Sequence, residues 1–101
     1  MTSEKTKQKL IIYLNLTQDF LEGRKSPVEF QRLYLRKFKD DKAEKWGNRT
    51  FNIINNLFLS AEAYCDDEGM RSEVIGAIDA PQLRKEVQAQ VLKLQKLLPN
   101  D

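Results

Sequence analysis

The stretch SPVEFQRLYLRKF, Ser26 to Phe38, contains the strongest local folding signal in the chain. A serine precedes a proline, and a glutamate stands three residues after the serine, which is the capping-box pattern of a helix start. Apolar residues then recur at three- and four-residue steps, the spacing that lines one face of a helix. These residues are Phe30, Leu33, Tyr34 and Phe38. The stretch therefore predicts a helix that begins after Ser26 and fades near Asp40.

The same periodicity predicts three more helices, on either side of this one. One precedes it, from about Lys5 to Glu22, and one follows it, from about Arg49 to Cys65. The last opens at Asp79, where Gln82 completes a second capping signal, and stops at Pro99. The predicted core rows of these helices are Leu10, Tyr13 or Leu14, Thr17 and Leu21; then Phe51, Ile54, Phe58, Ala61 and Cys65, with Leu57 and Tyr64 beside them; then Leu83, Val87, Val91 or Gln90, Leu94 and Leu98.

Apolar stripes joined by short connections favour an all-α fold, an antiparallel four-helix bundle. The spacing of the last helix also fits a coiled coil, but it lasts under three heptads, so a bundle core is the preferred interpretation. The polar segment before Gly47 is predicted as a connection in which Lys42 to Trp46 could add a turn, and MRSEVIGAI, from Met70, could form one short extra helix before the last. Trp46 and Phe51 are interpreted as core or hinge anchors.

Length and composition indicate a single domain, residues 1–101, with one core. The chain has no histidine, which removes the commonest general base and metal ligand and argues against an enzyme. Cys65 stands alone, so it predicts neither an intrachain disulfide nor a thiolate zinc site, and a packing role is expected for it. No apolar run approaches the length of a membrane span, and the default compartment is the cytoplasm.

Charge is distributed unevenly along the chain, whose net charge is +2. Residues 1–42 hold ten Lys and Arg against six Asp and Glu, whereas residues 43–79 hold three against seven. The acidic residues concentrate in SAEAYCDDEGMRSEVIGAID, Ser60 to Asp79, where several lie close to a helix C-terminus, a locally unfavourable position. One interpretation is an ordinary solvated surface, with Asp67 or Glu68 capping a short helix near Met70. The other is a negative patch that recognises a positively charged partner.

Other kinds of chemistry find little support. The aromatic residues among the lysines and arginines of the second helix have core spacing, so direct binding of nucleic acid is not expected. Glu62 and Asp66 lie one helical turn apart, but nothing around them indicates an acid and base pair. The DDEG run lacks the alternating ligands of a calcium loop, and no glycine-rich phosphate loop exists. We expect no metal and no cofactor.

Three segments carry a resemblance to a known family: SPVEF from Ser26, NNLFLSAEAYCDD from Asn55, and IDAPQLRKEV from Ile78. Together they make the chain similar, over roughly Ile12 to Leu94, to bacterial immunity proteins of the colicin D type, including those paired with contact-dependent growth inhibition toxins. The most specific part is the run of Ala61, Glu62, Tyr64, Asp66 and Asp67. None of these motifs is catalytic.

The resemblance implies a helical, cytoplasmic protein that binds and blocks a cognate transfer-RNA-cleaving toxin, as a monomer that forms a one-to-one complex. In that family, acidic side chains at the end of the third helix enter the basic active-site cleft of the toxin. Glu62, Asp66 and Asp67 match those acidic positions, whereas Cys65 and the net charge of +2 depart from the pattern. The residues expected to bind the toxin are Glu62, Tyr64, Asp66, Asp67, Glu68, Met70 and Glu73, with Tyr64 and Met70 as apolar anchors. The alternative is a non-enzymatic helical adaptor that binds a partner helix, and an enzyme is a more distant third.

Overall fold

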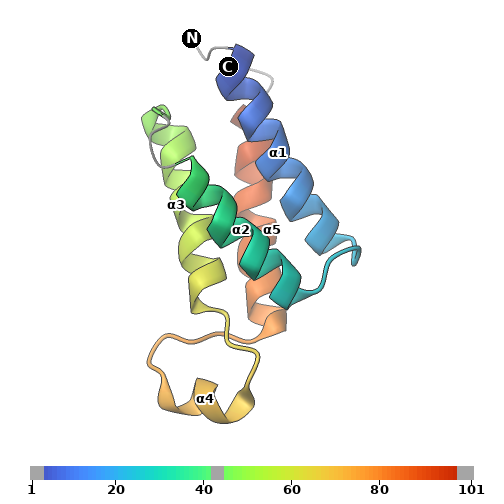
Figure 1. Cartoon of the computed structure of the whole chain (residues 1–101), viewed down its shortest axis with the longest axis vertical. Coiled ribbons are helices and arrows are strands. Elements are labelled where there is room, and N and C mark those ends of the chain that lie inside the picture. Colours follow the sequence, from blue (N-terminus) through green and yellow to red (C-terminus); the bar gives the residue numbers. More distant parts are fainter. Residues whose placement is uncertain (1–3, 42–44, 98–101) are drawn as a thin grey trace.

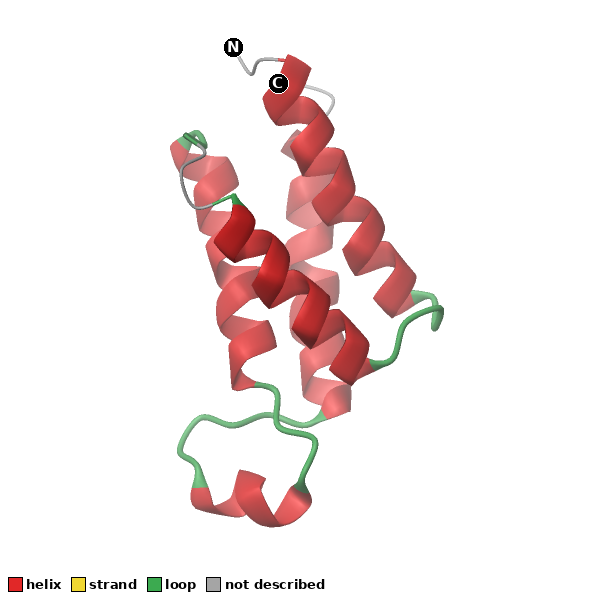
Figure 2. Cartoon of the chain, viewed as in Figure 1, coloured by secondary structure: helices red, strands yellow, loops and turns green. Residues whose placement is uncertain are grey.

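The computed structural model describes residues 4–41 and 45–97, with side chains from residue 7 onward, and these residues form an all-helical structure (Figure 1). Its elements are α1 (Glu4–Leu21), α2 (Pro27–Asp40), α3 (Asn48–Ala63), α4 (Glu68–Glu73) and α5 (Ala80–Leu97). Beyond these helices, the described residues contain one isolated bridge pair, Tyr64 with Ile78, and Figure 2 draws no strand. The all-α class and the short extra helix are confirmed.

Helix starts lie where the capping patterns predict them. The Glu29 amide donates to Ser26 Oγ, and the Ser26 amide donates to Glu29 Oε1, both at 3.1 Å, which completes the capping box of α2. These bonds from Ser26 lower the pKa of Glu29. At α5, the Gln82 amide donates to Asp79 Oδ1 at 2.9 Å. Both caps are satisfied by side chains that were recognisable in the sequence.

The four long helices run in alternating directions along the chain, and α4 lies beyond their lower ends (Figure 1). α1 packs against α2 and α5, and α3 also packs against α2 and α5. The molecule is elongated, with principal extents of 46 × 27 × 18 Å. The connection between α3 and α5 is thus carried to one extremity of the molecule.

One apolar core joins these helices. Its buried members are Leu10, Tyr13, Phe20, Phe30, Tyr34, Ile53, Ile54, Leu57, Ala61, Tyr64, Leu83, Val87, Val91 and Leu94. Aromatic rings link the helices in pairs: Phe20 stacks on Phe30 with centroids 4.7 Å apart, and Tyr13 meets Tyr34 edge-on at 5.4 Å. Trp46 also packs edge-on against Tyr13, at 5.9 Å, which confirms it as a core anchor.

The hydroxyl groups of two buried tyrosines donate hydrogen bonds across the core. Tyr34 donates its hydroxyl to the Ile54 carbonyl at 2.7 Å. Tyr13 donates to Asp41 Oδ2 at 2.9 Å, and this carboxylate also lies 3.3 Å from the ammonium of Lys37 and 3.8 Å from that of Lys9. Among the described residues, no buried side-chain nitrogen or oxygen atom lacks a hydrogen-bond partner.

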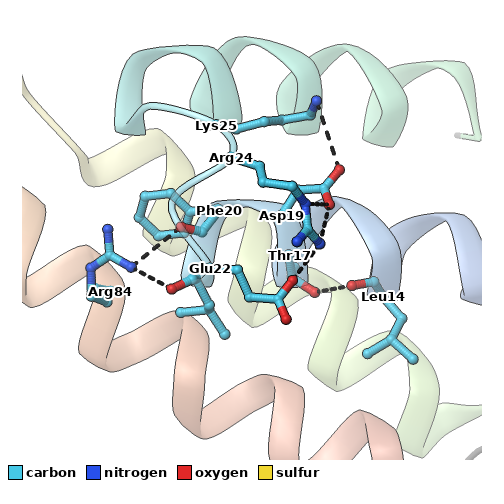
Figure 3. Close-up of polar contacts among 9 residues, drawn as sticks. Leu14, Thr17, Asp19, Phe20, Glu22, Arg24, Lys25 and Arg84 are labelled. Atoms are coloured by element: carbon cyan, nitrogen blue, oxygen red, sulfur yellow. Dashed lines mark hydrogen bonds and ion pairs between the residues drawn. The ribbon is translucent and has the colours of Figure 1, made fainter.

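The corner between α1 and α2 is closed by arginines (Figure 3). Arg84 of α5 donates to the Phe20 and Leu21 carbonyls, at 3.3 and 2.9 Å, and its guanidinium lies 4.8 Å from the Phe20 ring centroid. A cation is favourable at this position because the last carbonyls of a helix lack a partner within the helix and are partially negative. Arg24 binds Asp19 at 2.8 Å and also pairs with Glu22.

The predicted core rows need four corrections. Phe51 is 45% exposed, so the prediction of a core anchor is wrong; α3 turns Thr50, Ile53 and Ile54 inward instead because it packs between α2 and α5. Phe20 is fully buried, whereas the predicted Leu21 is half-buried at the end of α1. Four other predicted core residues are half-buried: Leu33, Phe38, Phe58 and Cys65. α3 ends at Ala63, two residues before the predicted Cys65.

Two sequence predictions fall outside the described residues. They are the extra turn, most of which would occupy residues 42–44, and the end of the last helix at Leu98 and Pro99. In the part of the chain that the structure covers, no helix is both long enough and apolar enough to cross a membrane.

Candidate functional site

The candidate site is the acidic loop, which we define as residues 64–78, together with Glu62 just before it. The loop is closed at its base by two backbone hydrogen bonds, from the Cys65 amide to the Ile78 carbonyl and from the Ile78 amide to the Ala63 carbonyl, both 3.0 Å. Its two ends therefore lie side by side while α4 projects beyond them (Figure 2). Compact loops with joined ends are frequently functional.

The end of α3, where the loop begins, is held by a side chain from α2. The Gln31 amide group donates to the Ala61 carbonyl at 2.9 Å and to the Tyr64 carbonyl at 2.7 Å. These carbonyls belong to the unpaired end of a helix whose last turn has no basic residue. Gln31 supplies the missing donors without adding positive charge, so the local negative potential is retained.

Tyr64 connects the loop to the core. Its side chain is buried, with 6% exposed, and its hydroxyl donates to Asp66 Oδ1 at 2.8 Å. Burial, together with this bond, raises the pKa of Tyr64 to about 12. Tyr64 was predicted to be an apolar anchor for a partner; in the structure its ring is buried and its hydroxyl positions a carboxylate.

Within the loop, polar contacts fix the backbone on both sides of α4. Asp67 caps this helix by accepting from the Met70 amide at 3.1 Å, so of the two caps considered in the solvated-surface interpretation, Asp67 or Glu68, the structure has Asp67. Arg71 Nη1 donates to the Cys65 carbonyl at 2.7 Å, and the half-buried Cys65 thiol lies 3.5 Å from the Asp67 carbonyl. The guanidinium of Arg71, the one cation of the loop, is thus directed at backbone.

The expected acidic residues all lie at this end of the molecule. Glu62 is in the last turn of α3, Asp66 and Asp67 precede α4, and Glu68 and Glu73 lie in α4; all five are exposed. Across residues 7–41 and 45–97, none of their carboxylates forms an ion pair. Asp66 and Asp67 each accept a bond from an uncharged donor, the Tyr64 hydroxyl and the Met70 amide.

A model of one protein family, described as bacterial self-protective colicin-like immunity, matches residues 9–94 of the chain. The chain belongs to this family. Neither a search of curated proteins nor a search of solved structures found a match. The resemblance inferred from the sequence is therefore confirmed at the level of colicin-like immunity, which makes a toxin protein the expected partner and an inhibitor, rather than an enzyme, the expected activity.

The structure of this immunity protein also shows apolar residues at the site that the sequence analysis did not include. Leu59, Val74 and Ile75 line an open groove of about 430 Å³ that also contacts Glu62. Ile75 is fully exposed, whereas Met70, which was predicted to belong to the site, is 56% exposed on α4. The adjacent pair Val74 and Ile75 is a recognisable signal, since two large apolar residues stand in a segment otherwise rich in charge and glycine.

The basic side of the immunity protein lies on α2, where Arg32, Arg36 and Lys39 are exposed. Phe30 and Tyr34, which alternate with them in the sequence, are fully buried, so these rings are not available to stack on bases. No group of three metal-ligating side chains occurs within the described ranges. The acidic loop is therefore the stronger candidate for a binding site.

Proposed function

We propose that this immunity protein binds the nuclease domain of a cognate transfer-RNA-cleaving toxin in a one-to-one complex in the cytoplasm. In this proposal the four long helices act as an antiparallel bundle that supports the acidic loop, and the loop occupies the basic active-site cleft of the toxin. The observation that carries the proposal is the group of exposed carboxylates, unpaired among the described residues, on one projecting loop.

The electrostatic argument begins with the toxin. A nuclease that grips a polyanion presents lysines and arginines around its cleavage site, because phosphate contacts supply most of the affinity for nucleic acid. This chain concentrates negative charge in a short segment, which can replace phosphates in such a cleft. The acidic residues are Glu62, Asp66, Asp67, Glu68 and Glu73. Complementary charge mainly accelerates encounter and suppresses wrong partners, and its effect falls as salt rises.

Rigidity of the loop supports the same proposal. The closed base, the Gln31 contacts and the Asp67 cap order the backbone before any partner arrives. A preorganised loop loses less conformational entropy on binding than a flexible one, so more of the interaction energy appears as affinity. A protein that protects against a lethal enzyme needs a dissociation constant in the nanomolar range, about −12 kcal/mol.

The test uses the toxin domain encoded beside the gene for this chain, co-expressed and copurified, with cleavage of transfer RNA as the assay. The best variants are Glu62→Gln, Glu68→Gln and Glu73→Gln combined, because these carboxylates accept no hydrogen bond within the described structure and their loss leaves the loop intact. We expect the triple variant to fold normally and to lose inhibition by about a hundredfold or more.

The matched control is the triple variant Arg32→Gln, Arg36→Gln and Lys39→Gln, which removes the same number of charges from the exposed face of α2. It is expected to inhibit the toxin like wild type. Full protection by the acidic-loop variant would refute the proposal that the acidic loop occupies the cleft of the toxin. A loss of protection confined to the α2 variant would place the interface on the basic face. Absence of a toxin gene beside this one favours the alternative, a helical adaptor for a partner protein.

A further inference from the structure

Large apolar side chains are exposed beside the carboxylates at the acidic end of the molecule. Ile75 is 104% exposed relative to an extended reference, and Val74 and Leu59 are 52% and 51% exposed. All three line the 430 Å³ groove between the end of α3 and the segment of the acidic loop that follows α4. We refer to Leu59, Val74 and Ile75 as the apolar ridge.

A tight turn fixes the backbone at Ile75, so that its side chain is held in an exposed position. The Ala77 amide donates to the Val74 carbonyl at 3.3 Å, and Gly76, at φ +85°, adopts a left-handed conformation that L side chains rarely take. Ile78, which follows this turn, donates its amide to the Ala63 carbonyl of α3 and packs against the core. The turn thus orders an isoleucine in water, although burial elsewhere in the fold would have been favourable.

We propose that the apolar ridge is the anchor that seats the immunity protein in an apolar pocket of the toxin, next to the cationic cleft. This inference rests on the proposed function and adds the second half of its interface. The charge around the ridge defines the partner: Glu62 lines the same groove and Glu73 immediately precedes Val74. The complementary surface is an apolar pocket with lysine or arginine at its rim.

The two parts of the interface have different tasks. Carboxylates contribute to encounter rate and lose strength with salt, whereas buried apolar anchors near the centre of an interface usually dominate the dissociation rate. Burying one isoleucine side chain corresponds to roughly a ten- to hundredfold gain in affinity. Ile75 is therefore expected to act mainly on dissociation, with little dependence on salt.

The experiment is calorimetric and kinetic titration of full-length immunity protein with the purified toxin domain of the neighbouring gene, at low and at high salt. The variants are Ile75→Ser and Val74→Ser, with Leu92→Ser as the matched control, since Leu92 is 50% exposed on α5, in the half remote from α4. Ile75→Ser should bind at least about tenfold more weakly through faster dissociation, with an unchanged salt dependence and an unchanged melting temperature. Leu92→Ser should bind like wild type.

Each other outcome is decisive. If Ile75→Ser binds like wild type while the acidic-loop variants bind weakly, the apolar anchor is overturned and the proposed function stands. If Ile75→Ser binds weakly while the acidic-loop variants bind normally, the apolar anchor stands and the proposal that the acidic loop occupies the cleft is overturned. If wild type does not bind the toxin domain, both are overturned. Self-association of wild type that Ile75→Ser abolishes, measured by sedimentation, would assign the ridge to a second copy of this chain instead.

Discussion

Tyr64 donates its hydroxyl to Asp66 at 2.8 Å, and this bond links the apolar core to the acidic loop. The Tyr64 ring is buried, whereas Asp66 is exposed two residues later. The orientation of the loop relative to the helices is therefore set in part by a side chain whose own position is fixed by packing. Changes in the core at this point are expected to reach the binding surface.

The first prediction concerns this bond at neutral pH. Replacing Tyr64 with Phe keeps the ring in the core and removes only the donor, so the free energy of unfolding should fall by about 1 kcal/mol, the usual net contribution of a hydrogen bond. Urea unfolding followed by circular dichroism measures this difference. An unchanged free energy of unfolding would show that the bond to Asp66 does not stabilise the fold.

The same variant carries a pH signature. The pKa of Tyr64 is raised to about 12 in the folded protein and lies near 10 in the unfolded chain, so the folded state retains the proton longer. The stabilisation is complete below about pH 10 and is lost as pH rises toward 12. The stability gap between wild type and Tyr64→Phe should consequently narrow over this window, as urea titrations at successive pH values would detect. A constant gap would contradict the raised pKa.

A second prediction concerns Gln31. Its replacement by Ala leaves the Ala61 and Tyr64 carbonyls without their α2 donor, so we expect a loss of about 1 to 3 kcal/mol and a looser loop base. Amide hydrogen exchange should accelerate at Cys65 and Ile78, whose amides close that base. The matched control is Gln88→Ala, at an exposed glutamine of α5. Exchange at the loop base that is equal in both variants would refute a bracing role for Gln31.

The helices were predictable because their signals are local. Ser26 with Glu29, and Asp79 with Gln82, form the caps that their spacing predicts. The buried face of α3 was harder to predict, since adjacent apolar residues occur along it and either of two stripes satisfies the helical period. Packing against both α2 and α5 buries Ile53 and Leu57 and leaves Phe51 outside, although Phe51 was predicted on the same stripe as the buried Ile54, and this selection depends on tertiary contacts.

For the candidate site, the sequence predicted the acidic cluster but not the way in which the loop is built. Local composition identified the cluster from Glu62 to Glu73, and the cap at Asp67 followed from its residue type. The closure of the loop between Cys65 and Ile78, and the reach of Gln31 from another helix, depend on residues distant in sequence. The exposure of Ile75 could not be inferred from its type, because isoleucine is usually buried.

A third prediction separates the charge of Asp67 from its capping role. Asparagine caps helices about as well as aspartate, so Asp67→Asn should preserve α4 while removing the charge. Alanine removes both. If charge is the contribution to toxin binding, the two variants should lose affinity to a similar degree, with Asp67→Ala alone showing faster exchange at the Met70 amide. Wild-type affinity of Asp67→Asn would assign this residue a structural role only.

The last prediction concerns the C-terminal end of α2, where Asp41 is buried and accepts a hydrogen bond from Tyr13. The ammonium groups of Lys37 and Lys9 lie beside this carboxylate. Its side chain is 6% exposed, so Asp41→Ala removes a buried acceptor and should cost about 2 to 3 kcal/mol in unfolding free energy. The neighbouring, exposed Asp40 gives a matched control of identical chemistry, and Asp40→Ala should cost less than about 0.5 kcal/mol.

Because this end of α2 lies away from α4 (Figure 1), Asp41→Ala should still bind the toxin domain with wild-type affinity below its lowered unfolding temperature. Equal unfolding midpoints for the two alanine variants would contradict a stabilising role for this carboxylate, whereas weakened binding by folded Asp41→Ala would extend the interface beyond the acidic loop.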